Sequence, residues 1–183
     1  PGLLEATFLK ESGTGALAAV ALVYPLVILS GMFSAGAFGG AISGFIARAI
    51  GAGNDDEASA VLICAVIISL AGGFLMWVLV VLLGPFLYQY ASDSPTITNA
   101  AHYYATLLFP AIPAYWLVNM LSSVLRGCGD MIRPAIVAAI LLAAYILCAL
   151  LLIPTQGATI NEALKGAAIA MASAYLLASV LVV

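Results

Sequence analysis

Charge is scarce in this chain. Five Lys and Arg and eight Asp and Glu make up 7% of its 183 residues, whereas roughly a quarter of a soluble domain is charged. Hydrophobic residues reach 65%, and the mean hydropathy is +1.21. This composition excludes an ordinary soluble domain and predicts that the chain crosses a lipid bilayer, which is its first partner.

Residues typical of catalytic or metal sites are also few. The chain has one His, no pair of acidic residues inside an apolar run, no GxSxG and no glycine-rich phosphate loop, so we do not expect an enzyme. Cys64, Cys128 and Cys148 lack CxxC spacing, which predicts neither a metal site nor a disulfide framework, and no cofactor is indicated. The net charge of −3 does not indicate a nucleic-acid partner.

Long apolar runs are what the sequence has instead. A transmembrane helix needs about 20 mostly apolar residues, and turn residues separate runs of that length. We predict the end of one helix at 1–10, full helices at 15–50, 55–83, 95–125 and 134–153, and the start of a helix at 163–183. The chain begins with Pro1 and stops inside an apolar run at Val183. We therefore expect an all-α, polytopic transmembrane bundle that is a fragment of a longer protein.

Capping residues mark the predicted turns. In ARAIGAGNDDEAS, Arg48 lies near the end of one helix, and Asn54 with Glu57 three residues later resembles a capping box. In LRGCGDMIRP, Arg126 ends a helix and Pro134 suits the first turn of the next. We predict that these two turns share one membrane side and that GPFLYQYASDSP forms a loop on the other.

The basic residues predict which side is cytoplasmic. Arg48, Arg126 and Arg133 lie on the side of the two turns, against Lys10 and Lys165 on the other side. Because cytoplasmic loops carry an excess of Lys and Arg, we expect the turns with Arg to be cytoplasmic in a multi-pass protein of the plasma (inner) membrane.

The run 15–50 is longer than a membrane is thick. At 1.5 Å per residue it would extend about 54 Å, against about 30 Å of hydrocarbon, so it must bend, break or protrude. Pro25 is a candidate hinge because it removes a backbone hydrogen bond. Gly36, Gly40 and Gly44 repeat every four residues, which is the spacing that lets helix backbones pack closely.

Glu5 is the acidic residue that lies inside an apolar stretch, in GLLEATFL. Burial of a charged carboxylate is costly, so such a residue exchanges a proton or a cation readily and is a candidate for ion coupling. The alternative is a solvated Glu near the interface, because Lys10 is only five positions away.

Tyr115, Trp116 and Asn119 are candidates for a substrate cavity, together with Ser34. Aromatic walls bind flat organic cations by stacking and cation–π attraction. The alternative is that the Asn bonds a neighbouring helix and the aromatic rings only fill the bundle. Pro110 and Pro113 predict a kink or hinge in the same helix, which transporters use to line a cavity, although packing alone also explains them.

Three segments resemble a known family. LLEATFLKESGTGALAAVALVYPL, SAGAFGGAISGFIARAIGAGNDDEAS and VLRGCGDMIRPA are similar, in order and spacing, to the amino-terminal lobe of the multidrug and toxic compound extrusion (MATE) family. The resemblance covers almost the whole chain. It implies twelve helices in two six-helix lobes. Residues 1–183 would then be the amino-terminal lobe from the end of its first helix through part of its sixth.

The resemblance also implies a mechanism. Members of the MATE family export organic cations in exchange for H+ or Na+, and the resemblance places Glu5 where they have a coupling Asp. Members often have an Asn on the fifth helix, where this chain has Tyr145 and Cys148. We therefore expect cation antiport of xenobiotics by alternating access, completed by a missing carboxy-terminal lobe. A lipid-linked saccharide flippase of the same superfamily and a non-transporting membrane scaffold are the alternatives.

Overall fold

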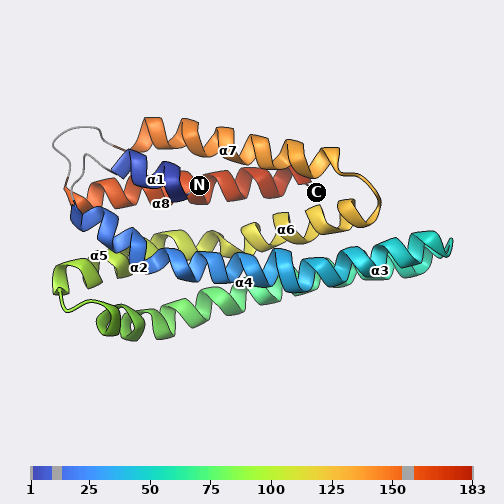
Figure 1. The fold of residues 1–183 in the computed structure, drawn as a ribbon, viewed down its shortest axis with the longest axis horizontal. Helices are drawn as coiled ribbons and strands as arrows, with labels where there is room; N and C mark the ends of the chain where they lie inside the picture. The colour runs from blue at the N-terminus through green and yellow to red at the C-terminus, as the bar shows by residue number, and fades with distance from the viewer. Residues whose placement is uncertain (1, 10–13, 154–158, 183) are drawn as a thin grey trace.

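Long helices lie side by side along one axis of the molecule (Figure 1). The computed structural model describes residues 2–9, 14–153 and 159–182, and within these ranges it contains helices and turns but no strand. The elements are α1 (Gly2–Leu9), α2 (Thr14–Gly31), the π-helix η2 (Met32–Phe38), α3 (Gly39–Gly51), α4 (Asp55–Ala91), α5 (Pro95–Leu108), the 3-10 turn η3 (Phe109–Ala111), α6 (Ile112–Gly127), α7 (Ile132–Leu152) and α8 (Ile160–Val182).

Five helical stretches of the described chain are long and apolar enough to cross a membrane. They are Thr14–Gly51, Asp55–Ala91, Pro95–Gly127, Ile132–Leu152 and Ile160–Val182. The prediction of an all-α transmembrane bundle is therefore confirmed. The α3–α4 and α6–α7 turns lie at the same end of the bundle (Figure 1). Lys10, which entered the count of basic residues, lies outside the described residues.

The predicted loop after Leu83 is wrong, because α4 continues through Gly84 and Pro85 to Ala91. Proline costs a helix one backbone hydrogen bond, but tertiary packing overrides that cost here. The Tyr88 ring is only 2% exposed in the core. A Cβ on Gly84 would lie 3.2 Å from that ring, so the glycine makes room for it. The turn to α5 is correspondingly short.

The run predicted at 15–50 stays helical throughout, and its irregularity is a change of helix type. The π-helix η2 follows Gly31, while Pro25 lies inside α2. Gly36, Gly40 and Gly44 are exposed, and a Cβ on any of them would meet nothing within 4 Å. They therefore do not pack against the described helices, because the opposite face of α3 is the buried one.

Glycines elsewhere produce a close contact between two helices of the bundle. A Cβ on Gly73 of α4 would lie 2.5 Å from the Cα of Pro113 in α6, and one on Gly72 would overlap the Trp116 ring. Pro113 thus lies at a packing contact with α4. Pro110 falls inside η3, which interrupts the long helix between α5 and α6.

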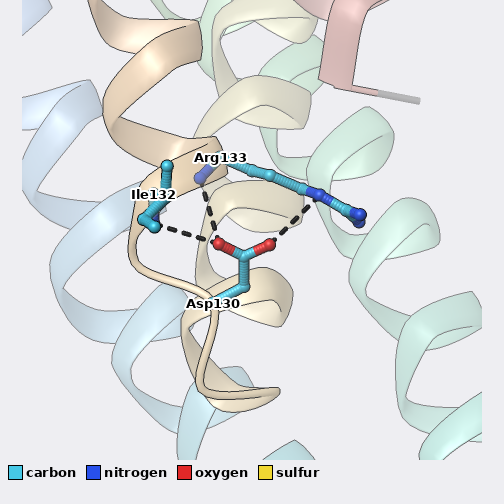
Figure 2. A network of polar contacts seen from close by, with 3 residues as sticks. All are labelled: Asp130, Ile132 and Arg133. Atoms are coloured by element: carbon cyan, nitrogen blue, oxygen red, sulfur yellow. Dashed lines mark hydrogen bonds and ion pairs between the residues drawn. The ribbon is translucent and has the colours of Figure 1, made fainter.

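The α6–α7 turn is closed by an aspartate (Figure 2). Gly129 has a φ of +84°, which favours glycine. One carboxylate oxygen of Asp130 accepts hydrogen bonds from the backbone N–H groups of Ile132 and Arg133, each at 3.0 Å. The other oxygen pairs with Arg133 Nε at 3.2 Å. These bonds satisfy the free N–H groups at the start of a helix, so α7 begins before Pro134 rather than at it.

Candidate functional site

Glu5 lies inside the bundle rather than at its surface. The short helix α1 packs against α2, α7 and α8, and Glu5 is only 1% exposed. The Tyr104 hydroxyl of α5 donates a hydrogen bond to the Glu5 carboxylate. An acidic side chain buried in a membrane-spanning bundle is costly, so this position demands a partner, which Tyr104 supplies.

Two further tyrosines surround this carboxylate. Tyr175 of α8 lines the same cavity as Glu5 and Tyr104, and Tyr145 of α7 belongs to the same buried cluster as Tyr104 and Tyr175. Tyr145 is fully buried, and its hydroxyl has no hydrogen-bond partner among the described residues. It lies in the stretch of α7 where the family resemblance implies an Asn and this chain has Tyr145 and Cys148. The carboxylate therefore lies in a cluster of phenol groups drawn from three helices.

A cavity of about 500 Å³ opens beside Glu5. It lies among α1, α2, α5, α6, α7 and α8, and residues from all six helices line it. The polar residues of its wall are Glu5, Tyr24, Tyr104, Tyr115, Asn119, Ser122, Arg126 and Tyr175. The remaining wall is apolar and comes largely from α7, with Val137, Ala138, Leu141 and Leu142. A cavity of this size and composition suits a drug-sized organic molecule.

The structure places Tyr115 and Asn119 in this wall. Tyr115 packs against Tyr175, with 4.7 Å between the ring centroids and 30° between the ring planes. With Tyr24, these rings give the wall an aromatic surface. An aromatic surface near a carboxylate is chemically suited to a flat organic cation.

Trp116 lies elsewhere, which differs from the sequence prediction. Successive residues of a helix point about 100° apart, so Trp116 faces α4 when Tyr115 faces the cavity. It is 4% exposed, its ring lies against Gly72, and its Nε1 donates a hydrogen bond to Ser30 Oγ at 2.7 Å.

Ser34 does not line the cavity either. It is fully buried in η2, where its hydroxyl donates to the Gly31 carbonyl at 3.3 Å and accepts from Asn119 Nδ2 at 2.8 Å. Ser34 therefore fixes the orientation of Asn119. Of the predicted hinge residues, Pro25 is not in the cavity wall, and neither are Gly36, Gly40 or Gly44.

Sequence reasoning missed Tyr104 and Arg126 as members of the site. Tyr104 lies two positions after His102, near the start of a predicted helix. Such a group of His and Tyr residues is typical of the membrane–water interface, so nothing in the local sequence linked Tyr104 to Glu5. Arg126 looked like a residue that ends a helix. Helical periodicity was the available signal, because Tyr115, Asn119, Ser122 and Arg126 follow one another at three- and four-residue steps on one face.

Solved structures of membrane transporters share this fold. The chain superposes with a TM-score of 0.89 and 25% identity on an inward-facing multidrug resistance MATE family transporter of the MOP superfamily, covering 98% of this chain and 40% of that one. A MATE structure in the bent conformation superposes with a TM-score of 0.90 at 25% identity, and the match covers 99% of this chain and 39% of that one. The chain also superposes on a MOP superfamily transporter from Pyrococcus furiosus, which is described by a reverse polarity of its binding pocket. The TM-score is 0.86 at 25% identity, and the match covers 98% of this chain and 39% of that one.

The chain thus spans about 40% of the length of the transporters it matches. No curated protein matches it in sequence. The family model described as MatE matches residues 3–154, which is most of the chain and includes both arginine-bearing turns. Together with the helical bundle and its buried carboxylate, this match shows that the chain belongs to the MATE family of membrane transporters.

Proposed function

We propose that this chain is the amino-terminal lobe of a secondary active multidrug exporter that exchanges organic cations for H+ or Na+. The observation that carries the proposal is the buried Glu5 carboxylate beside an aromatic cavity of about 500 Å³. A carboxylate in that place attracts either a coupling ion or a cationic substrate, and competition between the two is the simplest basis for exchange.

The coupling ion belongs at Glu5 in this proposal. Tyr104 donates to one carboxylate oxygen, which leaves acceptor capacity on the carboxylate for a proton or for a cation. The buried Tyr145 hydroxyl has no hydrogen-bond partner among the described residues, so it is available as an oxygen ligand or as a proton donor. Both H+ and Na+ are compatible with this chemistry.

A second lobe of the same polypeptide completes the transporter in this proposal. The face of η2 and α3 that carries Gly36, Gly40 and Gly44 is exposed and contacts none of the described helices. Small residues at four-residue spacing allow a helix of another lobe to approach closely. Rocking of the two lobes would open the cavity alternately to each side of the plasma (inner) membrane, with the two arginine-bearing turns in the cytoplasm. The substrate is moved without covalent change, so no enzymatic step is involved.

The test is ethidium export by the full-length parent in proteoliposomes under an imposed sodium or proton gradient. We expect gradient-dependent export that Glu5→Gln abolishes, because the neutral amide neither takes up a proton nor pairs with a cation as a carboxylate does. Glu57→Gln is the matched control, since Glu57 is exposed at the start of α4. Export by Glu5→Gln at the parental rate would contradict the role of Glu5. Absence of export under every gradient would contradict the antiporter.

A further inference from the structure

Arg126 is a charged residue of the cavity that the exchange of cations does not use. It lies in the last turn of α6 and forms part of the cavity wall together with Glu5. A guanidinium repels a purely cationic substrate, so its presence in the wall is unexpected for a site that binds only organic cations.

Most N–H donors of the Arg126 guanidinium have no acceptor among the described residues. It is half-buried, and the single ion pair of the described residues joins Arg133 to Asp130, so no carboxylate neutralises Arg126 there. One hydrogen bond is formed, from Nη2 to Ser123 Oγ at 2.7 Å. A guanidinium has five N–H donors, and the others have no protein acceptor among the described residues.

The orientation of Arg126 is fixed by a short relay. The Ser123 hydroxyl donates to the Asn119 carbonyl at 2.8 Å, and its lone pair accepts from Arg126. Gly39 of α3 leaves room for that hydroxyl, since a Cβ there would lie 2.5 Å from Ser123 Oγ. The charged head is therefore positioned by packed neighbours, as expected for a binding group and less so for a solvated helix end.

We propose that Arg126 forms an anion subsite of the cavity, which binds the carboxylate or sulfonate of an amphiphilic substrate. The apolar body of that substrate would lie along Val118, Val137 and Leu141 of the same wall. Arginine suits this task because its planar fork pairs with two oxygens of an acidic group at once. The proposal rests on the proposed function, and it assigns to Arg126 the recognition of the acidic group of a substrate in this cavity.

The test compares two ligands that differ in one charge. A rhodamine methyl ester is a cation, and the corresponding free acid is a zwitterion with the same ring system. Binding of both to the detergent-solubilised full-length transporter is measured by fluorescence polarisation. In Arg126→Gln we expect the free acid to lose about tenfold more affinity than the ester loses, as for removal of a charge-assisted hydrogen bond. Arg133→Gln, in the adjacent turn and outside the cavity wall, is the matched control and should leave both affinities at the parental value.

A second variant keeps the test valid if Arg126→Gln does not fold. Ser122→Asp places a carboxylate one helical turn before Arg126 on the cavity face, where it neutralises the guanidinium. We expect it to weaken binding of the free acid and to spare the ester. Equal changes for both ligands in either folded variant would overturn the anion subsite, whatever the export assay shows. Conversely, failure of the parent to export the ester would contradict the proposed function without altering the comparison of the two ligands.

Reconstitution separates a substrate from a lipid as the source of the acidic group. The binding measurement is repeated in nanodiscs of zwitterionic lipid and in nanodiscs that contain phosphatidylglycerol. We expect the same preference for the free acid in both. Loss of that preference only with phosphatidylglycerol would show that a lipid headgroup occupies the Arg126 subsite, which would overturn its assignment to a substrate.

Discussion

Tyr104 donates a hydrogen bond to Glu5 across 99 positions of sequence. The bond joins α1 to α5 inside the bundle and leaves the carboxylate beside the cavity rather than at the membrane surface. Both partners are at most 2% exposed. A carboxylate in such a place depends on this donor for its orientation, so in the proposed exchange the pair determines how Glu5 meets the coupling ion.

Tyr104→Phe tests that dependence. Loss of the hydroxyl removes a hydrogen bond to an acidic group, worth about 1.5–3 kcal/mol, so we expect export by the full-length parent to fall about tenfold or more. Proteoliposome transport under a fixed gradient measures the effect. Tyr103→Phe is the control, because Tyr103 lies outside the cavity wall. Equal rates for Tyr104→Phe and the parent would show that Tyr104 has no part in coupling.

Tyr115 and Trp116 are adjacent in sequence but differ in position, which predicts opposite outcomes. Tyr115→Ala removes one of two packed aromatic rings from the cavity. We expect about tenfold weaker binding of an aromatic cation, given an aromatic or cation–π contact of about 1–2 kcal/mol. Trp116→Phe leaves the cavity wall intact. Fluorescence titration of the purified transporter with ethidium distinguishes them, and a larger loss for Trp116→Phe would contradict the assignment of the cavity.

The contact between Asn119 and Ser34 ties α6 to η2. A double-mutant cycle of Asn119→Ala and Ser34→Ala should give a coupling energy of about 0.5–1.5 kcal/mol in the free energy of unfolding. Ser69→Ala provides the comparison, because Ser69 is equally buried but donates to the Val66 carbonyl of its own helix. The changes in the free energy of unfolding caused by Ser69→Ala and Asn119→Ala should therefore be additive. Thermal or denaturant unfolding in detergent measures both cycles, and additivity in the first would refute the link.

Gly73 determines how closely α4 approaches α6. An added methyl group would lie 2.5 Å from the Cα of Pro113, and backbone cannot move aside as a flexible side chain can. We expect Gly73→Ala to destabilise the transporter by about 1–3 kcal/mol. Gly51→Ala, where nothing lies within 4 Å, should be neutral or slightly stabilising. Melting temperatures of the two purified variants provide the comparison, and equal values would argue against the close contact.

Apolar run length and capping residues were enough to predict the helical bundle. Periodic burial, by contrast, is hard to see in a membrane chain, because both faces of a helix are apolar. That is why Trp116 and Tyr115 could not be separated by composition. The continuation of α4 beyond Pro85 depends on the packing of Tyr88 in the core. That packing is a tertiary contact, which the local sequence does not predict. The pairing of Glu5 with Tyr104 is equally non-local. Arg126 could have been found, since its spacing from Asn119 and Tyr115 places it on their face.

The length of the α5–η3–α6 helix has an electrical consequence. At 1.5 Å per residue, Tyr104 and Arg126 are separated by about 30 Å along the helix, which is close to the thickness of the hydrocarbon layer. The carboxylate held by Tyr104 and the guanidinium at the far end therefore lie at different depths in the electric field of an energised membrane. Moving one charge through a potential of about 100 mV changes its free energy by about 2.3 kcal/mol. In the proposed exchange, an ion that leaves Glu5 toward the cytoplasmic Arg126 end crosses much of that field, so voltage as well as concentration contributes to its release.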